Sequence, residues 1–256
     1  MRKTKLILTM LVATTLFASC VNEKKIGEIL KKNPEILHEA IKADPAGFIM
    51  TLQEAAADAK DSMEKKKFEK SFDNPLEPSI SDRDAVRGNP DGPLVLVEYS
   101  DFECPYCSRG YATMNQFMEK YKGQVKFVYK HLPLSFHKQA MIASQYFEAI
   151  KLQDQEKAFE FHDEIFKNQR GLKNGEAFLK KIAQKVGADM GKVAKDLNSE
   201  AVKDKIKADM AEAAKFQIQG TPGFVLNGVP IRGAYPISHF EMIVEELKKR
   251  DKVKLN

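Results

Sequence analysis

The spacing of apolar and polar residues changes along this chain near residue 79. Before that point, apolar residues recur three or four positions apart, which is the spacing of one face of a helix. Beyond it, the short runs 92–100 and 124–133 are dense in β-branched and aromatic residues, as is typical of strands. The pattern therefore predicts a helical N-terminal segment followed by a mixed α/β domain.

The first 20 residues predict a secretory signal peptide. A basic start is followed by an apolar run over 6–17 and by small residues before Cys20, and that run is too short to span a bilayer comfortably. Residues 17–20 also resemble a bacterial lipobox, in which Cys20 is lipidated. We favour lipidation over ordinary cleavage, in which Cys20 would belong to a discarded leader. The protein is then expected in the periplasm or cell envelope, and the absence of aspartate at Val21 and Asn22 favours the outer membrane.

Residues 21–78 predict a helical arm and a linker. Asn33-Pro34 and Asp44-Pro45 each place a capping side chain before a proline suited to a first helical turn. An apolar stripe follows at helical spacing: Phe48, Ile49, Leu52, Ala55, Ala56, Ala59 and Met63. Such a stripe needs a partner, so we expect self-association through residues 21–72, with packing on the chain's own domain as the alternative. Two prolines, Pro75 and Pro78, indicate the linker.

Residues 79–256 predict one domain in the order strand, helix, strand, helical block, hairpin and helix. The first helix is expected over 104–121, and a block over 136–217 has capping candidates at Asn174, Asp189 and Ser199. Asn227-Gly228, between two short apolar runs, is a strong hairpin signal. The last helix is expected over 238–250. This order predicts an α/β domain with helices inserted in its middle.

The charge balance argues against a nucleic-acid partner. The formal net charge is +5, but removal of the leader would reduce the 41 basic residues to 38 against 36 acidic ones. No basic stripe interleaved with aromatic residues appears in the sequence.

The three cysteines indicate redox chemistry. An exported protein meets an oxidising compartment, where disulfides persist, and without Cys20 the mature chain has only Cys104 and Cys107. A disulfide across two intervening residues would stabilise the fold poorly. A structural zinc site needs about four ligands, and the sequence supplies neither a second Cys-x-x-Cys nor a nearby histidine pair. Transient binding of a soft ion such as Cu(I) by the two thiolates remains an alternative.

The position of Cys104-Pro105-Tyr106-Cys107, after a strand and at the start of a helix, suits thiol exchange. Unpaired N–H groups and the helix dipole favour a thiolate at the first cysteine, and helix N-termini lower a cysteine pKa to about 3.5–7.5. The second cysteine, one turn later, can attack a mixed disulfide at the first. We therefore expect Cys104 to attack and Cys107 to resolve. No cofactor or metal is expected.

The segments "VEYSDFECPYCSRG" and "GTPGFVLNG" resemble the DsbA family of exported thiol:disulfide oxidoreductases, over about residues 93–249. The resemblance implies a thioredoxin-like α/β domain with an inserted helical domain. It also implies a cis proline at Thr221-Pro222 that faces the cysteines and pairs with an extended substrate. Glu98 matches the family's acidic position, which implies a proton acceptor beneath Cys107. Its alternative is an outward-facing strand residue.

Two departures from the family pattern bear on the direction of catalysis. Strongly oxidising members carry histidine where Tyr106 stands, and threonine before the cis proline is common among isomerases.

The helical arm resembles those of oligomeric DsbA-like and ScsC-like proteins. The resemblance thus implies an enzyme that forms or isomerises disulfides in exported proteins and exchanges electrons with a membrane or soluble partner. The alternatives are a lipoprotein that mainly binds copper or a protein partner, and a reductive role that protects thiols.

Overall fold

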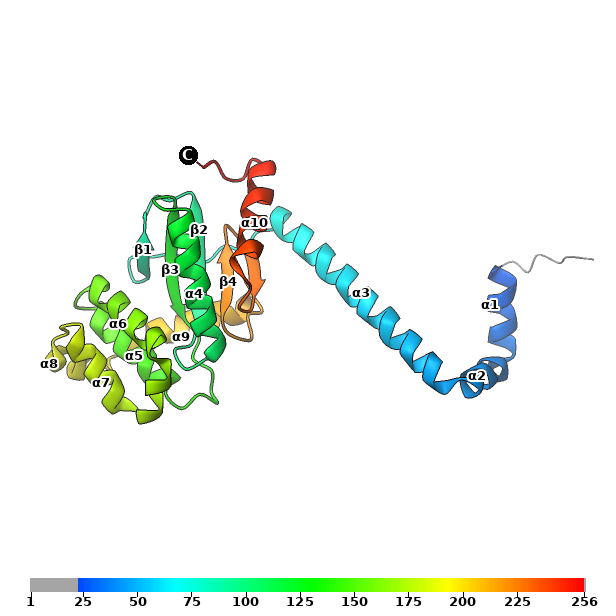
Figure 1. The fold of residues 1–256 in the computed structure, drawn as a ribbon, viewed down its shortest axis with the longest axis horizontal. Helices are drawn as coiled ribbons and strands as arrows, with labels where there is room; N and C mark the ends of the chain where they lie inside the picture. The colour runs from blue at the N-terminus through cyan, green and yellow to red at the C-terminus, as the bar shows by residue number, and fades with distance from the viewer. Residues whose placement is uncertain (1–22, 256) are drawn as a thin grey trace, which may run out of the picture. The chain divides into compact units, whose positions relative to one another are not determined.

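The computed structural model describes residues 23–255 (Figure 1). The chain divides into two compact units, residues 1–63 and residues 64–256, and the boundary falls within one long helix. The expected signal peptide and the lipidation site at Cys20 lie outside the described residues.

The first unit is helical. It contains α1 (Glu23–Lys32), α2 (Pro34–Ala43) and most of α3 (Pro45–Asp73). The Asp44 carboxylate accepts a hydrogen bond from the Gly47 N–H (2.9 Å) and so caps α3. Asn33 precedes α2, but its side chain donates to the Ile29 carbonyl (2.9 Å) instead of capping the helix.

The apolar stripe of α3 is exposed. Ile49, Leu52 and Met63 are 52%, 51% and 58% exposed. These side chains are therefore not covered within the first unit. Self-association through the arm stays a prediction, and so does its alternative, packing on the chain's own domain.

The second unit begins within α3, whose end packs on the domain. Phe72 is buried, and the Arg250 guanidinium lies 4.4 Å from its ring centroid. The segment that follows, 74–84, has neither helix nor strand, as the prolines predict. It is nonetheless held in place, because the Leu76 N–H donates to the Gly228 carbonyl (2.8 Å).

A five-stranded sheet in the order β1-β3-β2-β4-β5 organises the second unit. The strands are β1 (Ala85–Gly88), β2 (Leu94–Ser100), β3 (Val125–His131), β4 (Gly223–Leu226) and β5 (Val229–Arg232). β2 and β3 are parallel, and the other pairs are antiparallel. The sequence did not indicate β1, because only four residues pair and Arg87 interrupts their apolar character.

Helices cover both faces of the sheet (Figure 1). α4 (Pro105–Lys120) and α10 (Ile237–Lys249) lie across one face, whereas the end of α9 packs on the other. The inserted block contains α5 (Ala140–Lys151), α6 (Gln155–Lys167), a 3₁₀ helix η1 (Gln169–Asn174), α7 (Glu176–Lys185), α8 (Met190–Asp196) and α9 (Glu200–Lys215). This arrangement confirms the predicted fold class, a thioredoxin-like domain with a helical insertion and an N-terminal helical arm.

Two of the three capping predictions in the block are confirmed. The side chains of Asp189 and Ser199 accept hydrogen bonds from the first turns of α8 and α9. Asn174 was a wrong prediction, because it ends η1, and Gly175, with a φ of 64°, precedes α7 instead. Glycine adopts that positive φ without steric penalty.

The alternation of side chains along β2 and β3 gives the sheet two different faces. The face toward α4 carries Leu96 and Glu98 from β2 and Phe127 and Tyr129 from β3. We call it the redox face. The opposite face carries Tyr99 and Lys130, among others, and packs on the end of α9.

Candidate active site

The two cysteines lie at the N-terminus of α4. Cys104 is the residue before the helix, Pro105 occupies the first turn, and Cys107 lies one turn later. Both are free thiols in this structure, 4% and 0% exposed. Proline at this position suits the helix start, because its missing N–H would have no partner there.

Cys104 is arranged to ionise. The Cys107 thiol donates to its sulfur, and the backbone N–H groups of Tyr106 and Cys107 also stabilise the anion. Burial opposes these effects, but together they lower the pKa of Cys104 to about 5. At neutral pH this sulfur is therefore a thiolate, the nucleophilic form of cysteine.

Cys107 has the opposite tendency. Burial, the neighbouring Cys104 sulfur and the charge of Glu98 raise its pKa well above the usual value. The Asp101 N–H lies 3.4 Å from its sulfur. The pair is thus asymmetric, with an ionised sulfur near the surface and a protonated one beneath it.

Thr221 and Pro222 lie against Cys104, although they are distant in sequence. The peptide bond between them is cis, and the Cys104 sulfur is 3.4 Å from the Thr221 carbonyl oxygen. Gly110 of α4 allows this approach, because a Cβ there would be only 3.0 Å from the Pro222 ring. The structure therefore places Thr221 and Pro222 beside the cysteines, where the family resemblance led us to expect them.

Glu98 lies inside the protein on the redox face. Its side chain is fully buried, and neither carboxylate oxygen has a hydrogen bond of good geometry among the described residues, although the nearby Ser100 hydroxyl offsets burial in part. Burial raises its pKa to about 7, since a buried carboxylate without a partner is costly to ionise. The alternative of an outward-facing residue is wrong.

Tyr106 is exposed, and its ring contacts a cation. It is 54% exposed, and the Arg109 guanidinium lies 4.2 Å from its ring centroid. Tyrosine itself offers no positive charge, but this cation–π contact holds one on the first turns of α4. Sequence reasoning missed Arg109, although its position three residues after Tyr106 places both on one helix face.

Two further polar residues hold the loop before α4, and sequence reasoning missed both. Asp101 is fully buried and accepts from the N–H groups of Glu103 (2.7 Å) and Leu134 (2.8 Å). Gln169 donates to the carbonyls of Phe102 (2.9 Å) and Cys104 (2.7 Å). An aspartate that binds an N–H two residues later is a common turn signal, whereas Gln169 gave no local signal.

The described part of the chain shows neither a metal cluster nor a membrane span. No group of three or more histidine, cysteine or acidic side chains within residues 23–255 is placed to hold a metal ion. No helix in the same range has the length and hydropathy needed to cross a bilayer.

A sequence profile of the thioredoxin family matches residues 81–246, more than half of the chain. Among curated proteins, the Na(+)/H(+) antiporter NhaA 1 of Mycolicibacterium vanbaalenii is 34% identical over 163 residues. That match covers 62% of this chain but only 26% of the antiporter. The antiporter's transport activity therefore does not carry over.

Solved structures share the fold. A thioredoxin-like oxidoreductase from Silicibacter pomeroyi is 27% identical, with a TM-score of 0.58 over 66% of this chain and 94% of that one. α-DsbA1 of Wolbachia pipientis is 22% identical, with a TM-score of 0.59 over 70% and 96%. The catalytic domain of Proteus mirabilis ScsC is 23% identical, with a TM-score of 0.57 over 65% and 89%. The chain therefore belongs to the thioredoxin family and has the DsbA-like form of its fold.

Proposed function

We propose that this protein is a thiol:disulfide oxidoreductase that forms or isomerises disulfides in exported proteins. The asymmetric cysteine pair carries the proposal. Cys104 is poised as a thiolate at a helix N-terminus, and the Thr221 carbonyl beside it can pair with an extended substrate chain. The similar structure of a thioredoxin-like oxidoreductase from Silicibacter pomeroyi supports the same activity.

Oxidation of a substrate would proceed by two exchanges. A substrate thiolate attacks Cys104 in the Cys104–Cys107 disulfide, and Cys107 leaves with the bonding electron pair. A second substrate thiolate then attacks the substrate sulfur of the mixed disulfide and expels Cys104. The substrate gains a disulfide, and the enzyme is left reduced. A membrane or soluble partner must reoxidise it.

Isomerisation would begin from the reduced enzyme. The Cys104 thiolate attacks a wrong disulfide, which forms a mixed disulfide and frees one substrate thiolate. Rearrangement within the substrate then releases Cys104, or Cys107 loses its proton and resolves the complex. Glu98 can accept that proton, because its pKa of about 7 lets it exchange protons near neutral pH.

Substrate contacts are proposed at the exposed residues around the pair. Pro105 and Tyr106 are exposed at the start of α4, and Thr221 and Pro222 border Cys104 on the other side. Lipidation of Cys20 would tether this site to the envelope, where exported substrates fold.

The first prediction tests the role of Cys104. Cys104→Ser should abolish both insulin reduction and the refolding of scrambled ribonuclease, because serine cannot form the mixed disulfide. Cys107→Ser should still attack substrates but should accumulate mixed disulfides, which non-reducing electrophoresis can count. Full activity in Cys104→Ser would refute the proposed function.

A further inference from the structure

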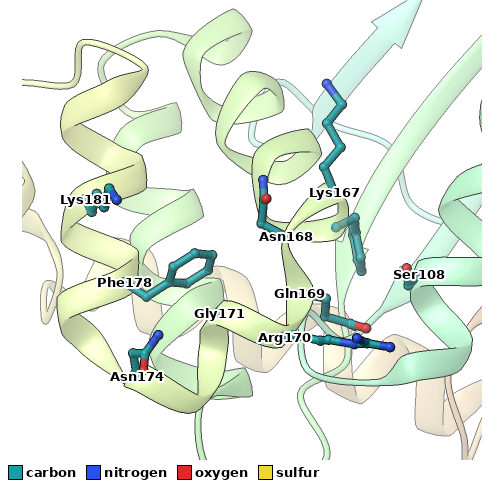
Figure 2. A pocket seen from close by; sticks show the side chains of 10 residues that line it. Ser108, Lys167, Asn168, Gln169, Arg170, Gly171, Asn174, Phe178 and Lys181 are labelled. Carbon is teal, nitrogen blue, oxygen red and sulfur yellow. The ribbon is translucent and has the colours of Figure 1, made fainter.

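A large open cavity lies next to the redox pair, between α4 and the inserted helices (Figure 2). Its volume is about 700 Å³. One wall contains Ser108, the residue after Cys107, and the others come from the end of α6, η1 and α7. The lining is Ser108, Phe166, Lys167, Asn168, Gln169, Arg170, Gly171, Asn174, Phe178 and Lys181. Three of these residues are cationic, and none is acidic.

The three cations of this cavity are unpaired. Lys167, Arg170 and Lys181 are exposed, and none forms an ion pair with any residue in the described range. Nearby lysines of α7 differ, because Lys180 pairs with Glu176 (3.2 Å) and Lys185 pairs with Glu164 (2.5 Å). The local carboxylates are thus engaged elsewhere, which leaves the cavity with an uncompensated positive charge.

The interior of the cavity offers apolar and amide groups as well. Figure 2 shows the Phe178 ring lying over Gly171, and a Cβ on that glycine would be only 2.3 Å from the ring. The amides of Asn168, Gln169 and Asn174 also line the cavity. Aromatic surface, amides and unpaired cations together suit a polypeptide better than a single small anion, which would use only the cations.

Gln169 connects the cavity to the backbone of Cys104. This residue lines the cavity and also donates to the Cys104 carbonyl (2.7 Å). A substrate chain bound at Cys104 can therefore extend into this cavity. We propose that this basic cavity binds a carboxylate-bearing segment of the substrate polypeptide, next to the cysteine that exchanges with Cys104. The proposal rests on the proposed function and specifies its substrate class.

The test compares disulfide exchange with two model peptides of equal length. Each carries one cysteine in a mixed disulfide with a chromophoric thiol, flanked on one side by three glutamates or by three glutamines. The full-length reduced protein should react about tenfold faster with the glutamate peptide at low salt, within the range of electrostatic steering. The preference should largely vanish near 1 M salt, where the Debye length is about 3 Å.

Substitution of the three cations tests whether the preference for the glutamate peptide depends on this cavity. The variant Lys167→Gln/Arg170→Gln/Lys181→Gln should react with both peptides at the same rate. The matched control Lys192→Gln/Lys195→Gln/Lys207→Gln removes three exposed lysines that do not line the cavity. It should keep the tenfold preference. If the cavity variant does not fold, Arg170→Gln alone and the salt dependence of the wild type provide the same test.

Three results would overturn the proposal. The first is equal rates with the two peptides in the wild type, and the second is an equal loss of the preference for the glutamate peptide in both triple variants. The third is exchange with glutathione disulfide that exceeds the rate with the glutamine peptide by as much as exchange with the glutamate peptide does. The last would indicate a site for small anions instead of a polypeptide. Failure of the proposed function is separately visible, because Cys104→Ser would then still exchange with both peptides.

Discussion

The two faces of the sheet bury charged groups in opposite ways. On the redox face, Glu98 has no hydrogen bond of good geometry among the described residues, and neither has the Tyr129 hydroxyl. On the other face an ion-pair cluster is buried, made of Asp84, Lys130, Lys205, Asp209 and Glu212. Lys205 lies 2.6 Å from Asp209 and 3.1 Å from Asp84, and Lys130 lies 2.6 Å from Glu212.

The carboxylates of the two faces titrate differently as a result. Burial would raise the pKa of Asp84, but Lys205, the Ser81 N–H and Lys130 together lower it below its usual value. Burial raises the pKa of Glu98 to about 7, because no cation compensates it. A paired carboxylate stays charged and holds the structure together, whereas an unpaired one can exchange a proton near neutral pH. The same functional group thus has a structural role on one face of the sheet and a chemical role on the other.

The largest expected effect comes from breaking the ion-pair cluster. Lys205→Met removes the cation nearest Asp84 and Asp209 and leaves their charges buried, which typically destabilises a protein by about 3–5 kcal/mol. Denaturant unfolding should show this loss. The thiolate titration of Cys104 should not change, because the cluster lies on the other face.

Lys207→Met is the matched control for this prediction. Lys207 belongs to the same helix, α9, but is exposed, so its loss should change the free energy of unfolding by less than about 0.5 kcal/mol. Equal stability of Lys205→Met and the wild type would contradict a structural role for the cluster.

The sequence predicted the residues of the redox face better than those of the opposite face of the sheet. Local signals were sufficient for β2, α4 and the cysteine pair, because apolar density, Pro105 and the Cys-x-x-Cys spacing lie within one short segment. The position of Thr221 and Pro222 required the family resemblance, since 117 residues separate Cys104 from Thr221. Glu98 was expected there too, but only the structure shows that its oxygens lack hydrogen bonds of good geometry.

The ion-pair cluster could not be predicted. Its members come from the segment before β1, from β3 and from α9, and charged residues at such positions ordinarily face solvent. Gln169 was missed for the same reason, because its partners Phe102 and Cys104 are 67 and 65 residues away. Such contacts depend on how the inserted helices pack, which no local pattern specifies.

The next largest effect is expected from Glu98, through the pH dependence of stability. In the unfolded chain this carboxyl ionises near pH 4.5, but in the folded protein only near pH 7. Between these values the folded state holds more protons, so stability falls as pH rises. A shift of this size corresponds to about 3 kcal/mol. Glu98→Gln should remove this slope, and thermal unfolding of the oxidised forms from pH 4 to 8 measures it without a contribution from the Cys104 thiol.

The same variant should affect catalysis. Loss of the proton acceptor should slow the resolution of mixed disulfides by Cys107 by about 10²-fold near pH 7, while the initial attack by Cys104 stays close to the wild-type rate. Glu148→Gln is the matched control, because Glu148 is also buried but lies 2.9 Å from His131, and its pKa is lowered. An unchanged pH slope in Glu98→Gln would contradict an unpaired carboxylate at this position.

The smallest expected effect compares two buried tyrosines on neighbouring strands. The Tyr99 hydroxyl donates to Glu212 (2.5 Å) in the ion-pair cluster, whereas the Tyr129 hydroxyl has no hydrogen bond of good geometry in the described range. Tyr99→Phe should lose a charge-assisted hydrogen bond and about 2 kcal/mol of unfolding free energy. Tyr129→Phe removes a buried hydroxyl that has only an interaction with the Ser100 hydroxyl, and should change the free energy of unfolding by less than about 1 kcal/mol. Denaturant unfolding measures the change in unfolding free energy of both variants. A larger loss of stability in Tyr129→Phe than in Tyr99→Phe would mean that polar contacts stabilise the redox face as well.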